Sequence, residues 1–305
     1  MICSLGLCMA LALAMAPQAE EGKKNDPYLA SLKLEISTAK DTIDPVDLLQ
    51  FTVRFTNTSD APLRLELNRA LPGRAIVHLI DPEGRTWRPV TLEMKGSTPS
   101  VILDLNAGEF AKFHGSYSLS FMRLQGARES FTLPQHGTWK VWAEYGRSAG
   151  LVKTNEATFQ VKTNEAMSPK VRELFRSETW HRFAVGGEVK DADLIRFRAF
   201  VLSGVEEGQK DVMARQLGFR YLGASQPFQA LEMFKAAFDS RLGNLDRVDA
   251  TLCKAYGLWI SNHLHLDEAL TLLNQVETDP KDVVRRRVEE MRAGILKAKR
   301  KPEGK

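Results

Sequence analysis

The residue types that most often bind metals or act as nucleophiles are sparse in this sequence. His263 and His265 form its only close histidine pair, with Asp267 following at once. Zinc sites use three or four protein ligands, and no further cysteine or histidine stands beside this pair, so we predict no metal site. Cys253 has no partner histidine in its own segment, and we expect it to be a small buried residue of a helix rather than a nucleophile.

The standard catalytic motifs are also missing. The sequence contains no phosphate-binding loop, dinucleotide fingerprint, GxSxG elbow or HExxH helix. The paired carboxylates Glu206-Glu207 and Glu289-Glu290 are adjacent in sequence, and adjacent side chains on a helix point in different directions. We therefore predict a protein that is not an enzyme and uses no cofactor. A hydrolase built from scattered residues stays open as an alternative.

The N-terminus has the pattern of a secretory signal peptide over residues 1–16. An apolar run from Ile2 ends in the small residues Ala14 and Ala16, before Pro17 and a charged stretch. A membrane anchor needs about 20 apolar residues, and this run is shorter. We predict cleavage after Ala16, a linker over 17–27, export to the periplasm or the extracellular space, and no stable membrane insertion afterwards. An uncleaved anchor and a start codon further upstream are the alternatives.

Composition and charge indicate an ordinary soluble protein. Hydrophobic residues make up 43% of the 305 residues and charged residues 26%, close to globular averages. The segment 281–305 contains ten Lys or Arg and four Asp or Glu, a balance of +6 against +4 for the whole chain. We interpret these cations as a solvated helix face followed by a basic tail over 301–305, and we expect no nucleic-acid partner. Once the signal peptide has left, Cys253 is the remaining cysteine, so an intrachain disulfide is excluded.

The first half of the chain has the period of β-strands. Apolar residues stand at every second position in three early segments, and turn residues separate such segments throughout the half; the three are Leu32-Leu34-Ile36, Leu49-Phe51-Val53-Phe55 and Leu63-Leu65-Leu67. Period two is typical of strands with one buried face, and we expect seven or eight of them without intervening helices.

The sequences of these strands resemble those of bacterial Ig-like modules, including those of the intracellular proteinase inhibitor family. The matching segments are FTVRFTNTSDAPLRLEL, IDPEGRTWR, LNAGEFAKF and LPQHGTWKVWAEY. The resemblance implies an all-β Ig-like sandwich, which we place over residues 28–165. It also raises an alternative function, inhibition of an exported protease through a loop of the sandwich, for which 92–101 is the candidate.

From Ser168 onward the apolar period becomes helical. Ser168-Pro169 is a typical helix start, and the segment from Asp191 carries a broad apolar stripe that includes Ile195 and Leu202. The next segment resembles a tetratricopeptide repeat, with Leu217, Gly218, Tyr221, Ala230, Phe234 and Ala237 at the family's spacing. A second copy has Gly257, Ala269, Leu273 and Val276 at the same offsets, but 39 residues separate its glycine from Gly218 instead of the usual 34.

The resemblance implies an all-α tetratricopeptide-like helical repeat over 166–300. The predicted fold class is therefore a two-domain chain, with an all-β Ig-like sandwich followed by this all-α repeat. First helices of such repeats line a groove, and the family's offsets place Arg215, Phe219, Lys254, Leu258 and Asn262 on it. We expect a binding or scaffolding protein whose partner is a protein or peptide of the cell envelope, held by these side chains.

The proposed signal peptide gives a direct prediction. N-terminal sequencing of exported material is expected to read from Pro17 or within a few residues of it, because the small residues Ala14 and Ala16 suit the peptidase. Recovery of the chain from the cytosol with Met1 retained contradicts export.

Overall fold

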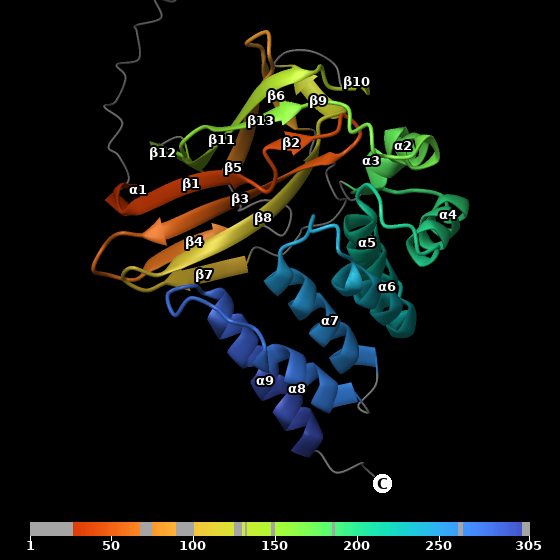
Figure 1. Cartoon of the computed structure of the whole chain (residues 1–305). Coiled ribbons are helices and arrows are strands. Elements are labelled where there is room, and N and C mark those ends of the chain that lie inside the picture. Colours follow the sequence, from red (N-terminus) through yellow and green to blue (C-terminus); the bar gives the residue numbers. More distant parts are fainter. Residues whose placement is uncertain are drawn as a thin grey trace, which may run out of the picture.

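The computed structural model describes residues 27–67, 75–89, 101–124, 130–131, 133–147, 150–184, 187–261 and 265–300. The predicted signal peptide, nearly all of the linker, the basic tail and nearly all of the predicted inhibitory loop lie outside these ranges. Figure 1 shows the strands gathered in one part of the molecule and the helices following them in an arc, with α9 at its far end.

The strands form a three-stranded, a larger and a two-stranded sheet. Their order is β1-β3-β8 in the first, β10-β9-β6-β5-β11-β13-β2 with β12 beside β11 in the second, and β4-β7 in the third. Strand β2 pairs with β13 in parallel, so the larger sheet is mixed. The bounds are β1 Leu32–Thr38, β2 Thr42–Ile43, β3 Leu48–Asn57, β4 Leu63–Leu67, β5 Ala75–Ile80, β6 Thr86–Pro89, β7 Val101–Leu105, β8 Phe110–Ser118, β9 Phe121–Leu124, β10 Ser130–Phe131, β11 Gly137–Arg147, β12 Gly150–Lys153 and β13 Ala157–Val161.

One apolar core holds the strands together. Leu32, Leu34 and Ile36 of β1 are buried and Lys33 between them is exposed, which confirms the predicted alternation. The inner face of β3 meets large side chains of the larger sheet, among them Trp139. Each large side chain buried in this way stabilises the fold by about 1.5–3 kcal/mol.

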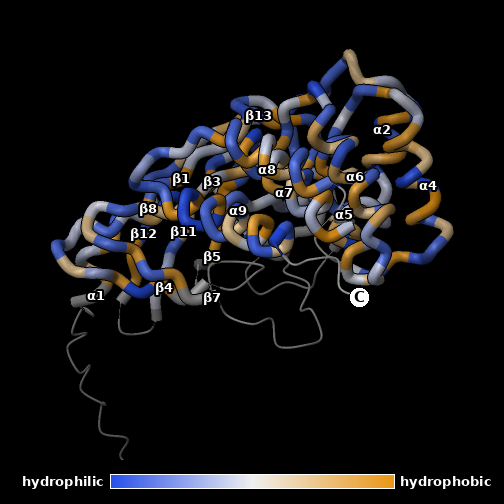
Figure 2. The backbone as a smooth tube through the Cα atoms, turned by 90° about the horizontal axis from the view of Figure 1, so that it is seen from below, coloured by the Kyte–Doolittle hydropathy of each residue, from blue (hydrophilic) through white to orange (hydrophobic). Residues whose placement is uncertain are grey.

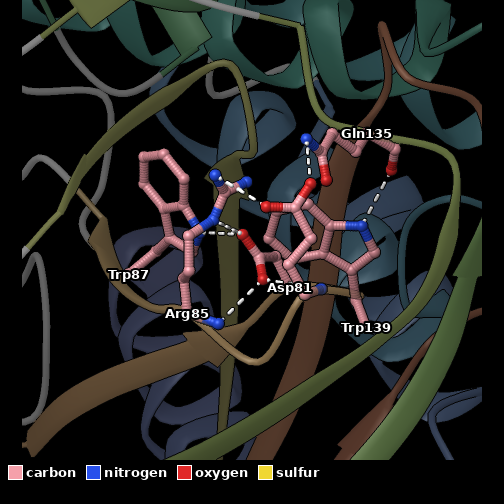
Figure 3. A network of polar contacts seen from close by, with 6 residues as sticks. Asp81, Arg85, Trp87, Gln135 and Trp139 are labelled. Carbon is pink, nitrogen blue, oxygen red and sulfur yellow. Dashed lines mark hydrogen bonds and ion pairs between the residues drawn. The ribbon is translucent and has the colours of Figure 1, made fainter.

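A polar network fixes the turn between β5 and β6. The Asp81 carboxylate accepts hydrogen bonds from two main-chain amides of its own turn, from Arg85 Nε at 2.6 Å and from Trp87 Nε1 at 2.8 Å. Burial alone would raise the pKa of Asp81, but the hydrogen bonds from Trp87 and Arg85 outweigh it and lower the pKa. Gln135 connects this turn to β11, because its side-chain amide donates to Glu83 at 2.8 Å and its main-chain carbonyl accepts from Trp139 Nε1 (Figure 3). The network is therefore a structural lock of the sheet.

The helices follow the strands in sequence. Their bounds are α1 Pro27–Ala30, α2 Pro169–Arg176, α3 Glu178–Ala184, α4 Asp191–Leu202, α5 Lys210–Gly223, α6 Pro227–Asp239, α7 Arg247–Ser261, α8 Leu266–Asn274 and α9 Val284–Arg300. Helix α2 begins at Pro169 as predicted, although the Ser168 hydroxyl makes no capping hydrogen bond. Within the described ranges no helix is both long and apolar enough to cross a membrane.

Strand β3 connects the two parts of the molecule at its first residue. Leu49 is buried in the core between the sheets, whereas Leu48 and Val46 are buried in the helical core that contains Trp180 and Met213. Close by, the buried Asp44 carboxylate pairs with Arg172 of α2 at 2.7 Å. Strands and helices therefore share a core at this junction.

A second junction joins β8 to the start of α9. The main-chain N–H of Phe110 donates to the carbonyl of Lys281 at 2.9 Å, and the N–H of Val283 donates to the carbonyl of Phe110 at 3.0 Å. Arg286 of α9 pairs with Glu109 at 2.5 Å. The first turn of α9 is therefore attached to the edge of the strands (Figure 1).

These junctions overturn the predicted fold class. The chain is not a separate all-β Ig-like sandwich followed by a separate all-α tetratricopeptide-like repeat, but a mixed α/β structure. The physical reason is that β3 buries side chains on both faces at its start, while the prediction assigned one buried face to every strand. Strand β13 ends at Val161 and α2 begins at Pro169; the domain boundary predicted between residues 165 and 166 lies between them and stays a prediction.

Leu48 provides a test of the shared core. Leu48→Ala removes a fully enclosed side chain from the helical core, and we expect the free energy of unfolding to fall by about 2–5 kcal/mol in urea denaturation. Leu151→Ala on β12 is the matched control, because Leu151 is 52% exposed and its truncation should change stability by about 0.5 kcal/mol or less. Equal effects of the two changes contradict the shared core.

Candidate functional site

The centre of the helical layer is the Phe234 ring of α6, which is fully buried between α5 and α7. A methyl group on Gly218 of α5 would lie 2.4 Å from this ring, and one on Gly257 of α7 would lie 3.1 Å from it. Both glycines of the predicted repeat copies therefore make room for the same side chain. Gly218 faces the helix that follows it, whereas the nearest side chains to Gly257 belong to the helix before it, so the two copies are not packed equivalently.

The predicted binding residues Arg215 and Phe219 lie one turn apart on α5. The Arg215 guanidinium pairs with Asp249 of α7 at 2.8 Å and lies 5.1 Å from the centroid of the Phe219 ring. It also interacts with the buried Cys253 thiol. Phe219 packs edge-on against Phe234 at 5.2 Å, yet 43% of its surface is exposed. The partly exposed Phe219 ring therefore packs against a cation that is itself paired with Asp249.

Lys254 does not share the surface of Arg215. Its Nζ lies 4.4 Å from the Phe238 ring centroid of α6 and 3.9 Å from a Glu268 carboxylate oxygen of α8. Asp249, which does face Arg215, precedes Lys254 by five residues, and five residues turn a helix by about 140° beyond a full circle. The predicted pairing of Arg215 and Lys254 on one surface is therefore wrong.

Leu258 is also misplaced by the prediction. Its side chain is fully buried in the cluster that α7 forms with α8 and α9, which includes Ala269 and Ile295. Phe219 occupies the same offset of the first copy but has no such cover. The difference arises because α9 covers the second helix pair with Val288, Met291 and Ile295. The remaining predicted residue, Asn262, lies outside the described residues.

Among the described residues of the helical layer, the most exposed large apolar side chains flank an ion pair between α4 and α6. Arg198 Nη2 of α4 lies 2.7 Å from a Glu232 carboxylate oxygen of α6. Ile195, one turn before Arg198, is 70% exposed, and Phe228, one turn before Glu232, is 65% exposed. Figure 2 shows apolar stretches along α4, which lies at the end of the molecule opposite α1. Ile195 and Phe228 are therefore candidates for a surface that a partner covers.

Phe219 lies near the end of α5, which a short loop joins to the start of α6, where Phe228 stands. Helices joined by short loops run antiparallel, so the start of α4, the end of α5 and the start of α6 face one way. We call the three exposed side chains Ile195, Phe219 and Phe228 the apolar end. Two of these residues are not evident from the sequence: Ile195 is predicted only as part of a broad apolar stripe, and Phe228 belongs to no predicted site. The one available signal was the width of the α4 stripe, which exceeds what a single neighbouring helix covers.

Two histidines have partners suited to catalysis, but both are enclosed. His181 Nδ1 of α3 and Ser118 Oγ of β8 lie 2.6 Å apart, with the two residues 0% and 1% exposed. Burial lowers the pKa of His181 to about 4, which keeps the ring neutral. His78 hydrogen-bonds to Glu144 at 3.1 Å across the larger sheet, and burial lowers its pKa as well. A substrate cannot reach either pair in this conformation, so both are structural contacts.

Other residues considered for chemistry also have structural environments. Burial raises the pKa of the Cys253 thiol to about 11, so the thiolate needed for nucleophilic attack is scarce at neutral pH. His265 lies 3.7 Å from Glu268, whereas His263 is outside the described ranges. In the part of the chain that the structure describes, no group of three or more His, Cys, Asp or Glu could hold a metal ion.

Comparison with known proteins gives no family for the chain. No family model and no curated protein sequence matches it. Among solved structures it is similar to a β-glucosidase from Erythrobacter marinus, with 18% identity, a TM-score of 0.28, and coverage of 43% of this chain and 15% of the other. A β-glucosidase from Listeria innocua in complex with isofagomine has 16% identity, a TM-score of 0.24, and coverage of 43% and 16%.

An alkylpurine DNA glycosylase from Pseudomonas fluorescens, bound to DNA with an abasic site analog, has 11% identity, a TM-score of 0.26, and coverage of 44% of this chain and 31% of its own. The chain thus spans less than a third of the length of each of these three structures. At such scores the likeness identifies neither a fold nor a function.

The enclosure of Phe234 gives a test with an internal control. Gly218→Ala places a methyl group against the buried ring, and we expect it to lower the free energy of unfolding by about 1–3 kcal/mol. Gly223, the last residue of the same helix, has nothing within 4 Å of the corresponding position. Gly223→Ala should therefore be neutral or stabilising by up to about 1 kcal/mol in the same urea titration. Equal destabilisation by both substitutions would show that the Gly218 position does not contact the Phe234 ring.

Proposed function

We propose that this chain is a non-catalytic binding protein that holds a protein or peptide partner through the apolar end formed by Ile195, Phe219 and Phe228. The observation that carries the proposal is the exposure of Ile195 and Phe228, 70% and 65%, on both sides of the Arg198–Glu232 ion pair. Large apolar side chains beside a paired charge are typical of the central contacts of protein interfaces.

The environment of Phe219 adds to this support. Its ring rests on the buried Phe234 and on Arg215, which is itself held by Asp249. A side chain supported on both sides loses little conformational freedom when a partner covers it, and this favours binding. The enclosed Ser118–His181 and His78–Glu144 pairs give no corresponding support for a hydrolase.

The partner belongs to the cell envelope under this proposal. That part rests on the predicted signal peptide over residues 1–16, which would carry the mature chain out of the cytoplasm. An exported chain meets proteins and peptides far more often than nucleic acid, so the apolar end and the predicted compartment point to the same class of partner.

The proposal predicts that binding depends on the two most exposed side chains. The mature chain, used as bait in an envelope extract, should retain a specific protein, and Ile195→Ser with Phe228→Ser should weaken its capture at least about tenfold, as expected when two central contacts of about 1 kcal/mol or more are lost. Both positions are exposed, so the double variant should keep the unfolding midpoint of the wild type.

Leu151→Ser is the matched control, since Leu151 is an exposed leucine on β12, a strand of the larger sheet that pairs with β11. It should leave capture unchanged. A partner retained equally by the wild type and by the double variant would exclude the apolar end and redirect attention to the strands.

A further inference from the structure

The junction between β3 and α5 encloses a small polar cavity. It has room for about one water molecule, with a volume of about 10 Å³, and its polar lining includes Lys40, Asp47, Gln209 and Asn244. Asp47 precedes β3 and is 9% exposed, and Gln209 precedes α5 and is 2% exposed. The cavity therefore lies between the strands and the helices, where the two parts share a core.

Most polar groups around the cavity have partners. Gln209 Nε2 donates to the carbonyl of Leu48 at 3.1 Å, which ties α5 to β3. Asn244 donates to Asp211 through its side chain at 2.7 Å and its main chain at 2.9 Å, and it accepts from Lys40.

Two buried acceptors remain. Among the described residues, Asp47 Oδ1 and Gln209 Oε1 have no hydrogen-bond partner. An ionised carboxylate and an amide oxygen both accept and neither donates, so a direct hydrogen bond between these two atoms can form only when Asp47 carries a proton. A buried polar group left without a partner destabilises the fold, which favours the protonated form.

The charges around Asp47 favour the same state. Four charged groups face the junction: Asp44 from the same loop, Arg172 from α2, Lys40 from the segment before β2, and Asp211 from α5. Arg172 pairs with Asp44, which leaves Lys40 to balance both Asp47 and Asp211. One proton restores the balance, and Asp47 is the better site for it, because Asp211 accepts two hydrogen bonds from Asn244 whereas Asp47 Oδ1 accepts none.

We infer that Asp47 is a proton-operated latch between the strands and the helices. With its proton, Asp47 donates to Gln209 Oε1 while Gln209 Nε2 holds the carbonyl of Leu48. Without it, both atoms are acceptors, and apart from a water molecule in the cavity the carboxylate gains a donor only if the Gln209 amide turns over, which breaks the bond to Leu48. Loss of the proton thus loosens the attachment of α5 to β3. This inference is independent of the proposed binding surface.

The pH range follows from the direction of the shift. The pKa of Asp47 is raised from 3.8 to about 7, chiefly by burial and next by neighbouring Asp44, against the opposing effect of Lys40. Because the folded pKa exceeds the unfolded one, the stabilisation is complete below about pH 4 and is lost as the pH rises to about 7. His181, whose pKa is lowered, acts in the opposite direction between about pH 4 and 6.5, so a comparison between variants is needed.

The test compares the equilibrium constant of unfolding in urea between pH 5 and 9 for the full chain, Asp47→Asn and Asp60→Asn. The ratio of the wild-type constant to that of Asp47→Asn should rise by up to about tenfold per pH unit and level off near pH 7. Asp60 is exposed in the turn after β3, so Asp60→Asn should follow the wild type. If the ratio of these two unfolding constants does not change with pH, the proposed role of Asp47 is overturned.

Two further measurements keep the test decisive if Asp47→Asn fails to fold. Carboxyl ¹³C NMR of the wild-type chain should show Asp47 titrating near pH 7, and a midpoint within about one unit of 3.8 overturns the proposal. Lys40→Met removes the facing cation and should move that midpoint to higher pH, whereas an unchanged midpoint contradicts the charge balance described for the junction.

Discussion

Leu48 and Leu49 are neighbours in β3, yet they are buried in different apolar cores. Successive side chains of a strand point to opposite faces, so burying both requires packed material on both faces of the sheet at that point. The helices α2, α3 and α5 supply it on one side and the larger sheet on the other. The position of α5 is fixed by this contact, and α6 and α7 are then placed by packing around the Phe234 ring.

The polar groups at the same junction determine how the strands and the helices align with each other. Asp44 is buried and ionic, and its charge is matched by Arg172 and by the main-chain N–H of Asn164 at 2.7 Å. Removing one partner from such a pair is far more destabilising than replacing both, so the loop before β3 and the start of α2 depend on each other. An apolar contact alone would allow sliding between strands and helices, whereas these directional contacts fix the register.

Local patterns in the sequence predicted local structure. They failed where the burial of a side chain depended on an element distant in the sequence. The alternation of Leu32, Leu34 and Ile36 gave a strand with one buried face, and Gly218 does approach a buried ring as its spacing indicated. Leu48 could not be assigned to the helical core, because an apolar residue at a strand start fits either face. Phe219 and Leu258 have the same offset in their copies, and only the position of α9, which no local pattern contains, buries one and exposes the other.

Strand β8 touches the helical arc at both of its ends. Its first residue, Phe110, pairs with the chain just before α9, and its last, Ser118, contacts His181 of α3. Eight residue steps of extended chain span about 26 Å and stretch very little. The strand therefore fixes the distance between the two ends of the arc. The arc therefore has a fixed curvature. The arc can neither flatten nor coil more tightly around a ligand without breaking one of the contacts at the ends of β8. A ligand must therefore conform to its shape.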